Sequence, residues 1–159
     1  MLTTEEAKKL WDLVKPLETA MLVTSEQDLM QARPMQLVQD KFDGTFYFFT
    51  EVPTEKTREV SQHQNICLTF SCPKSQSYVS VSGKASVIRD NELIEKFWSP
   101  FIAAWFPQGK EDPSVALMKI EAYQAEYWQG KGSKITQLFK YANAYVSGHR
   151  PDIGKHEQF

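Results

Sequence analysis

The chain has 159 residues, of which 42% are hydrophobic and 24% are charged, a length and balance that predict one soluble globular domain. Eighteen basic and 20 acidic residues give a net charge of −2, so the basic excess of a nucleic-acid-binding protein is absent. No apolar run approaches the roughly 18 residues that a membrane span needs, and the acidic N-terminus does not resemble a signal peptide. We therefore expect a cytoplasmic protein with neither nucleic acid nor membrane as a partner.

Hydrophobic periodicity and turn residues divide the chain into helices and strands. In chain order, we expect a helix at 3–15, strands at 19–25, 32–40 and 45–50, a short helix at 54–63, strands at 65–72 and 77–90, a helical segment at 90–106, a strand at 115–130 and a helix at 133–146. About six antiparallel strands with peripheral helices predict a mainly β protein, a closed or nearly closed β-barrel. The expected domain covers residues 1–148, and residues 149–159 form a polar C-terminal tail on the surface.

Three local signals refine this pattern. Asp43 and Gly44 predict a hairpin turn that pairs the second strand with the third. Gly83 predicts a bulge or bend inside the long fifth strand. Ser99, followed by Pro100, predicts the cap and first residue of a second helical segment within 90–106.

The residue pattern gives little support for catalysis by side chains alone. The three histidines are scattered, and none has metal-ligand spacing with a cysteine or a carboxylate, so no metal site is expected. Cys67 and Cys72 lie five residues apart in one expected strand, which argues against a disulfide between them and fits free thiols in a reducing compartment. Nucleophile motifs and phosphate-binding glycine loops are absent, and no catalytic residue can be identified.

Cations at the start of the short helix point to an anion. Lys56 and Arg58 lie within about its first turn, where each opposes the helix dipole at a cost of about 0.3–1 kcal/mol when exposed. One interpretation is that Glu55 and Glu59 offset them on a solvated face. The other is that a phosphate is held between the helix amides, Thr54 as the helix cap, and these cations.

Arg33 bears on this choice. Pro34 has no amide hydrogen and is confined to a strand edge or a bulge, so it aims Arg33 in a fixed direction. If the expected hairpin forms, Arg33 lies near Thr50, and Arg33 and Lys56 could share one phosphate. The alternative is an ordinary surface arginine.

Five segments, in this order and spacing, together resemble the general stress protein branch of the pyridoxamine 5'-phosphate oxidase-like flavoproteins. They are ARPM at 32–35, FYFFT at 46–50 with a lysine six residues beyond it, YVSVSGKA at 78–85, FPQGKEDPSVALMKI at 106–120 and AEYWQGK at 125–131. The resemblance covers about residues 4–148. It implies a split β-barrel that forms a homodimer and binds FMN, or FAD as the alternative, at the interface between the subunits.

The resemblance also implies contacts for individual residues. Arg33 and Met35 are expected to touch the ribityl phosphate and the ring edge of the flavin. Phe49 and Thr50 belong to the strand whose backbone and hydroxyl contact the isoalloxazine, and Lys56 matches the phosphate-binding lysine.

Aromatic residues complete the expected site. Trp128 matches the aromatic residue that the partner subunit lays near the flavin, and Tyr78 stands where the oxidases have a glutamine that contacts FMN. Trp98 and Trp105 are further candidates for walls of the ring site, with packing in the helix core or the dimer interface as the alternative.

The chain departs from true pyridoxamine phosphate oxidases at two places. Glu55 stands where those enzymes have an arginine, and the segment after Trp128 lacks their Arg-x-His sequence. Both differences argue against oxidation of vitamin B6, and the first predicts modest FMN affinity. We therefore expect a flavin-dependent oxidoreductase with an unknown small-molecule redox partner; the alternatives are a non-catalytic flavin-binding or storage module and a barrel that stacks nucleic-acid bases on its aromatics.

Overall fold

The computed structural model describes residues 2–26, 28–130, 134–150, 152 and 154–159, with the backbone alone at residues 26 and 134–140. In chain order the elements are α1 (Thr4–Val14), the 3-10 helix η1 (Lys15–Leu17), β1 (Thr19–Glu26), β2 (Leu29–Gln36), β3 (Thr45–Glu51), α2 (Glu55–Gln62), β4 (Asn65–Cys72), β5 (Ser77–Ile88), α3 (Asn91–Phe97), α4 (Pro100–Ala103), β6 (Val115–Gly130), α5 (Lys134–Ser147) and β7 (Gly154–Gln158). Each expected element has a counterpart, with β7 in addition, but β2 occupies 29–36 whereas a strand at 32–40 was expected. The expected start of the last helix at residue 133 lies outside the described residues.

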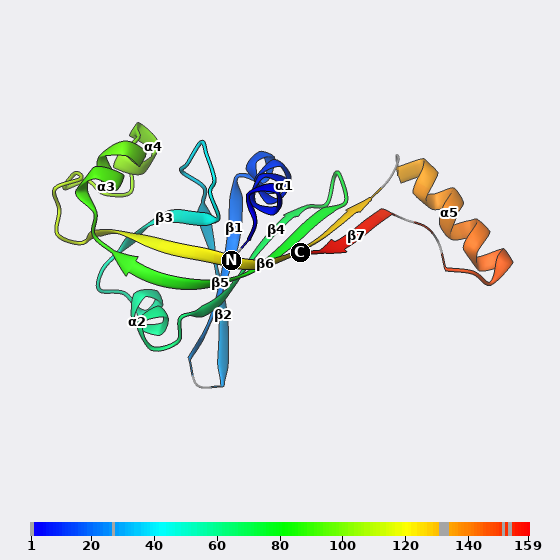
Figure 1. The fold of residues 1–159 in the computed structure, drawn as a ribbon, viewed down its shortest axis with the longest axis horizontal. Coiled ribbons are helices and arrows are strands. Elements are labelled where there is room, and N and C mark those ends of the chain that lie inside the picture. The colour runs from blue at the N-terminus through cyan, green and yellow to red at the C-terminus, as the bar shows by residue number, and fades with distance from the viewer. Residues whose placement is uncertain (1, 27, 131–133, 151, 153) are drawn as a thin grey trace.

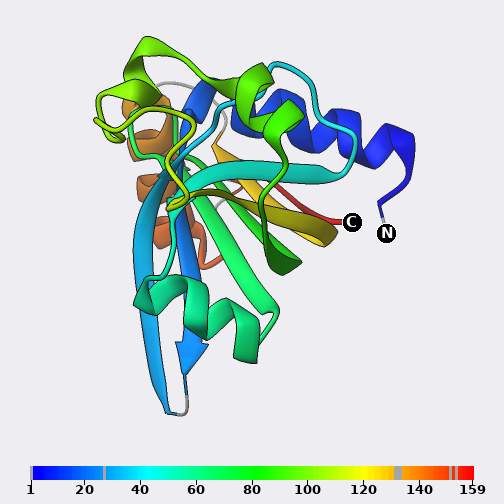
Figure 2. The ribbon, with the colours of Figure 1, turned by 90° about the vertical axis from the view of Figure 1, so that its left-hand side faces the viewer.

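The strands form one antiparallel sheet in the order β2-β1-β4-β5-β6-β3, and β7 pairs with the far end of β6. The sheet curls into a half-barrel with the helices around it (Figures 1 and 2). This arrangement confirms the mainly β, split-barrel class. Helix α5 lies at the end of the long axis of the molecule, beyond the ends of β6 and β7 (Figure 1).

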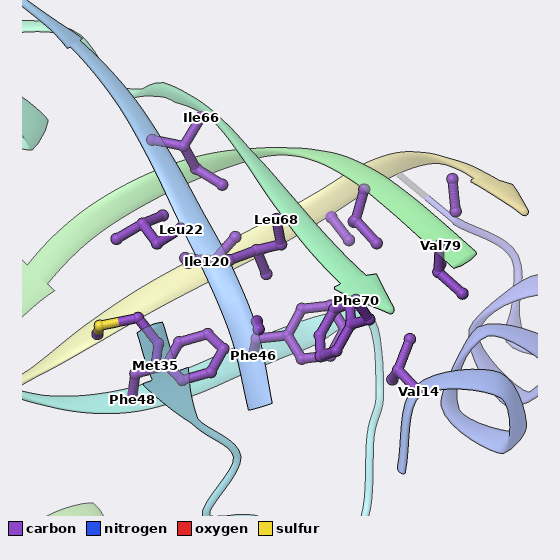
Figure 3. Packing of buried hydrophobic residues seen from close by; sticks show 14 of the residues in the cluster. Val14, Leu22, Met35, Phe46, Phe48, Ile66, Leu68, Phe70, Val79 and Ile120 are labelled. Atoms are coloured by element: carbon purple, nitrogen blue, oxygen red, sulfur yellow. The ribbon is translucent and has the colours of Figure 1, made fainter. Parts of the chain in front are cut away.

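The core fills the concave side of this sheet. Phe46 and Phe48, two residues apart on β3, are both fully buried, because alternate strand residues point to the same face. They meet Phe70 from β4 and apolar residues from β1 and β6 (Figure 3). Helix α1 covers part of the core after a capping box in which Glu6 N donates to Thr3 Oγ1 at 3.3 Å and Thr3 N donates to the Glu6 carboxylate at 2.7 Å.

The expected hairpin between β2 and β3 is wrong. β3 pairs with β6 along its whole length, and the described partner of β2 is β1. At the β3 edge, the buried side chain of Gln39 takes the place of a neighbouring strand. Tyr47 N donates to Gln39 Oε1 at 2.8 Å, and Gln39 Nε2 donates to Thr45 O at 2.9 Å. These hydrogen bonds satisfy backbone groups that a hairpin partner would otherwise have to satisfy.

Gly83 lies at the predicted bulge. The register between β5 and β6 shifts between Ser82 and Gly83. A Cβ at Gly83 would lie 2.8 Å from Ile120 Cγ2 and 3.0 Å from Glu121 O, so the close approach of β6 requires a glycine at this position.

The C-terminal tail contributes a strand that the sequence pattern does not predict. Residues 154–158 form β7, and its side chains are mostly exposed because GKHEQ is polar. The aromatic ring of Phe159 packs against the core, while its backbone exchanges hydrogen bonds with Ala125 at 2.5 and 2.7 Å. The tail therefore belongs to the same sheet, since its backbone pairs with β6 although its side chains are polar.

Candidate functional site

A cavity of about 390 Å³ opens between β2, β3, the start of α2 and the segment that contains α4. Its volume lies in the range of about 300–1,000 Å³ that is usual for small-molecule sites. Met35, Phe49, Thr50 and Lys56 all line it, so the structure brings together four of the eight residues that the sequence indicates.

Thr50 supplies a polar group that has no protein partner. Its side chain is 2% exposed, and its Oγ1 is a buried oxygen with no hydrogen bond among the described residues. An unsatisfied buried polar group costs about 1–3 kcal/mol. Because Thr50 lines the cavity, a ligand there is its available partner.

Lys56 places a half-buried cation in the same cavity. Its Nζ lies 3.7 Å from Met35 Sδ, and no carboxylate of the described residues lies within ion-pair distance. Burial lowers the pKa of Lys56 and the nearby positive charge of Arg33 lowers it further, while Glu51 acts in the opposite direction. An anion in the cavity would stabilise this ammonium group.

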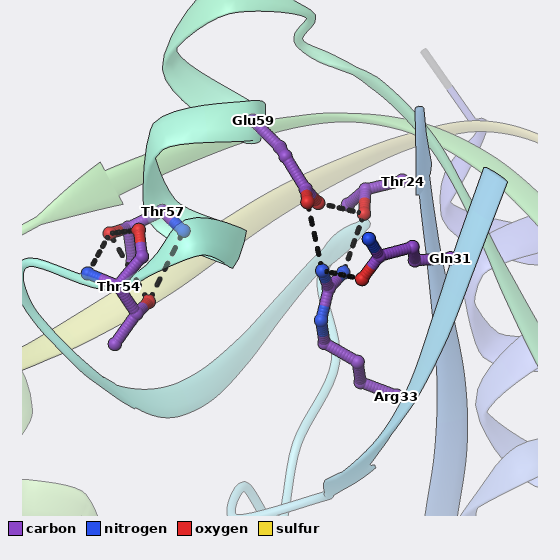
Figure 4. A network of polar contacts seen from close by, with 6 residues as sticks. All are labelled: Thr24, Gln31, Arg33, Thr54, Thr57 and Glu59. Carbon is purple, nitrogen blue, oxygen red and sulfur yellow. Dashed lines mark hydrogen bonds and ion pairs between the residues drawn. The ribbon is translucent and has the colours of Figure 1, made fainter. Parts of the chain in front are cut away.

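Arg33 is held in an internal polar network and does not line the cavity (Figure 4). Its guanidinium donates to Thr24 Oγ1 at 2.7 Å and to Gln31 Oε1 at 2.5 Å, and it forms an ion pair with Glu59 at 2.9 Å. Thr24 Oγ1 in turn donates to Glu59 at 2.5 Å. The network therefore joins β1, β2 and α2.

The interpretation that Glu59 lies on a solvated face is wrong, because its side chain is 1% exposed. Burial raises the pKa of Glu59, but the hydrogen bonds from Arg33 and Thr24, together with the charge of Arg33, outweigh this effect and hold the pKa below its usual value. Glu55, at the start of the same helix, is exposed as expected. The two carboxylates of this helix therefore differ in setting, because Glu55 faces solvent and Glu59 belongs to the internal network.

Thr54 is the cap of α2, as predicted. Thr57 N donates to Thr54 Oγ1 at 3.3 Å, and Thr54 N donates to Thr57 Oγ1 at 3.0 Å. Thr54 is not part of the cavity wall. It fixes the start of the helix and thereby the position of Lys56 in the first turn.

Tyr78 and Trp128 lie apart from the cavity. They are directly opposite each other on β5 and β6, and both are partly exposed. The ring of Trp128 stacks on His156 of β7, with centroids 5.0 Å apart and planes within 5° of parallel. His156 Nε2 lies 2.5 Å from Glu126 Oε1. Sequence reasoning missed His156 because it did not predict β7.

Trp98 directly follows α3 and Trp105 lies two residues after the end of α4, and their side chains have different surroundings. Trp98 packs edge-on against Phe49, with centroids 5.7 Å apart, and also contacts Phe106, so the packing alternative holds for Trp98. Trp105 lines the cavity and is 72% exposed, next to Phe101, which is 57% exposed. Phe101 lies on the apolar helical stripe of residues 90–106, one turn before Trp105, but the sequence pattern did not indicate it as a wall of the ring site.

Comparison with known proteins identifies the family. The model of the family described as "Pyridoxamine 5'-phosphate oxidase like" matches residues 5–152, so the chain belongs to this family. It is 31% identical over 117 residues to general stress protein 26 of Bacillus subtilis, covering 72% of this chain and 81% of that protein. Protein bli-3 of Neurospora crassa is 24% identical over 140 residues, covering 82% of this chain and 67% of that protein.

Solved structures agree with this assignment. A protein from Jannaschia sp. CCS1 described as a general stress protein 26 aligns over 99% of both chains, with 25% identity and a TM-score of 0.75. The general stress FMN/FAD binding protein from Xanthomonas citri aligns over 82% of this chain and 93% of its own, with 29% identity and a TM-score of 0.71. These relatives place the chain in the general stress protein branch.

Among the residues that the structure describes, no group of three or more histidine, cysteine, aspartate or glutamate side chains could hold a metal ion. Among the helices that the structure describes, none combines the length and apolar character needed to cross a membrane.

Proposed function

We propose that the chain binds FMN in the cavity between β2 and β3 and acts as a flavin-dependent oxidoreductase. The observation that carries this proposal is the pairing, in one cavity, of the half-buried Lys56 ammonium with the unsatisfied Thr50 hydroxyl. A flavin mononucleotide offers a phosphate to the first and a polar ring edge to the second. Binding of FMN or FAD by the related Xanthomonas citri protein supports the choice of ligand.

In this proposal different residues contact different parts of FMN. Lys56 binds the phosphate, Thr50 bonds to a polar ring atom, and the apolar side chains of Met35 and Phe49 pack against the ring and exclude water. Arg33 adds positive potential at the phosphate end from within its network, consistent with its effect on the pKa of Lys56. We propose FMN over FAD because its single phosphate matches Lys56, the one cation among the described residues of the cavity wall.

The proposal includes a homodimer. Tyr78 and Trp128 are partly exposed and distant from the cavity of their own chain, so they can contribute to a flavin site only from a partner subunit. When bound, the flavin would supply two-electron redox chemistry, while the protein residues hold and orient it. Two free cysteines fit the proposed cytoplasmic location.

The decisive experiment is Lys56→Ala, with FMN affinity measured by isothermal titration calorimetry. Loss of one charge-assisted contact should weaken binding by about 1.5–3 kcal/mol, or roughly 10- to 150-fold in Kd. Lys8→Ala, which removes an exposed lysine on α1, is the control and should bind FMN like the wild type. Equal affinity of the Lys56→Ala and Lys8→Ala variants would contradict the assignment.

The second candidate function is a flavin-binding or storage module without turnover. It is favoured by the chemistry of the described cavity wall, whose ionisable side chains are Lys56, which we assign to the phosphate, and the exposed Glu51. Anaerobic addition of NADH or NADPH to the FMN-loaded protein separates the two functions. Stoichiometric bleaching of the flavin absorbance, followed by continued oxidation of the nucleotide once oxygen is admitted as the electron acceptor, supports the enzyme. Tight binding of FMN without reduction by either nucleotide supports the module.

A further inference from the structure

The cavity has a buried floor and an exposed aromatic rim. Thr50 and Met35 form part of the floor and are almost inaccessible to solvent. Phe101 and Trp105 form the rim and are 57% and 72% exposed. The residues to which we assign FMN contacts belong to the floor and its edge, so the rim has no assigned partner.

Hydrogen bonds hold the backbone around Trp105. Ser99 caps α4 through a hydrogen bond from Ile102 N at 3.2 Å, and Trp105 N donates to Ile102 O at 3.0 Å. Neighbouring Trp98 and Phe106 pack on each other, whereas the ring of Trp105 has no aromatic contact among the described residues. A large apolar ring held open at the mouth of a cavity is typical of a binding surface.

The charge of the lining limits what can bind at this rim. Among the described lining residues, Lys56 and Glu51 are ionisable. If Lys56 holds the flavin phosphate, an incoming anionic molecule would meet a carboxylate and no cation. A planar molecule without a negative charge can stack on Trp105 and Phe101 without this penalty.

We propose that Trp105 and Phe101 form the subsite for the second ligand of the flavin site, and that this ligand is a planar, uncharged ring compound. The inference rests on the proposed function, because it assigns Lys56 to the flavin phosphate. It excludes phosphorylated substrates such as the vitamin B6 phosphates from this subsite. Trp105 is the specificity-determining residue, because it offers the largest free ring face on the rim.

Two probes with the same ring and different charge test the proposal. Equilibrium dialysis against the FMN-loaded, oxidised protein compares 2-naphthol, which is neutral at pH 7, with 2-naphthoate, which is an anion. We expect the neutral compound to bind about tenfold more tightly, because the anion meets the Glu51 carboxylate. Equal affinity for the two probes would overturn the proposal that this subsite selects an uncharged ligand.

Variants then locate the subsite. Trp105→Ala should weaken 2-naphthol binding about tenfold, because an aromatic stacking partner and its contact area are lost. Trp105→Phe should retain most of the affinity. Tyr145→Ala removes an exposed aromatic ring on α5 and should have no effect. The affinity of all three variants for FMN should stay within about threefold of wild type, which is smaller than the tenfold loss expected for 2-naphthol.

The outcomes separate this inference from the function on which it rests. If the wild-type chain binds FMN but not 2-naphthol, or if Trp105→Ala binds 2-naphthol normally, the subsite is refuted alone. It is also refuted if Trp105→Ala loses FMN affinity or changes its sedimenting mass, because Trp105 would then be a flavin wall or an interface residue. If the wild-type chain binds no FMN, both proposals fail.

Discussion

The ion pair between Arg33 and Glu59 is the residue-scale feature on which the position of α2 depends. Glu59 comes from α2, Arg33 from β2, and Thr24 from β1 bonds to both. A carboxylate buried to this degree is tolerated only when it is paired and hydrogen-bonded. The network therefore fixes α2, and with it Lys56, against the sheet.

Removing one partner of this pair should be more harmful than removing both. Arg33→Met leaves the buried Glu59 charge without its cation, at a typical cost of about 3–5 kcal/mol, and the partial exposure of Arg33 favours the lower end. Glu59→Gln keeps a hydrogen-bonding side chain and should cost about 1–2 kcal/mol. The double variant Arg33→Met with Glu59→Met should recover most of the loss. Urea unfolding at pH 7 measures all three, and a double variant as unstable as the sum of the single variants would contradict this account.

The same pair predicts a pH dependence of stability. Because the pKa of Glu59 is lower in the folded chain than in the unfolded chain, its ionisation stabilises the fold above the unfolded value of about 4.3. This contribution is lost as the pH falls through the lower, folded pKa. The stability difference between wild type and Glu59→Gln should therefore be constant from pH 6 to 7 and shrink below about pH 4.3. Urea midpoints at several pH values test this, and a difference that grows on acidification would contradict it.

At the scale of elements, the edge of β3 depends on one side chain that stands in for a strand. Gln39 accepts from Tyr47 N and donates to the carbonyl oxygens of Thr45 and Lys41. β3 carries Phe49 and Thr50, so the geometry of the cavity floor depends on this edge.

Gln39→Ala should destabilise the fold, because it removes three hydrogen bonds to backbone groups near the surface of the barrel. The cost of leaving such groups unsatisfied is about 1–3 kcal/mol each when water cannot reach them, and we expect about 2 kcal/mol in total because the site is only partly buried. Asp40→Ala changes the exposed neighbour and should leave the free energy of unfolding in urea within about 0.5 kcal/mol of wild type. A midpoint for Gln39→Ala equal to that of Asp40→Ala would show that the edge does not need this side chain.

At the scale of the whole molecule, exposed apolar side chains lie away from the cavity. They are Met21, Leu29, Met30, Tyr78, Tyr123, Trp128, Tyr141, Tyr145 and Val146. Helix α5 contributes the last three and lies beyond the sheet, at the end of the molecule (Figure 1). An isolated helix of 14 residues is only marginally stable in water, and the homodimer proposed above would offer α5 a surface to pack against.

We expect a homodimer that sediments at about twice the chain mass of 18.3 kDa. In that dimer, Trp128→Ala should weaken FMN binding while the Lys56 contacts of the same cavity remain, because the lost ring would come from the partner. Sedimentation velocity gives the mass, and calorimetry gives the affinity. A monomeric sedimenting mass would contradict the dimer. Wild-type affinity of the Trp128→Ala variant for FMN would contradict a site shared between two subunits.

The sequence by itself determined the positions of most helices and strands, the bulge at Gly83 and the cap at Thr54. These features depend on side-chain alternation, turn residues and caps within a few neighbouring positions. The resemblance also indicated Met35, Phe49, Thr50 and Lys56, and the structure brings these four into one cavity. Strand β7 was not predictable, because its polar residues show no alternation and its pairing with β6 depends on backbone groups alone.

Only the tertiary structure decided which strand pairs with β3, which carboxylate is buried and which tryptophan stays open to the cavity. The turn at Asp43 and Gly44 is compatible with either neighbour, and the choice of β6 over β2 depends on sheet closure across about 70 residues of sequence. Glu55 and Glu59 are equally polar in sequence, but packing of α2 on the sheet buries only Glu59, beside Arg33. Burial and strand pairing are set by contacts distant in the chain, and local composition carries no signal for them.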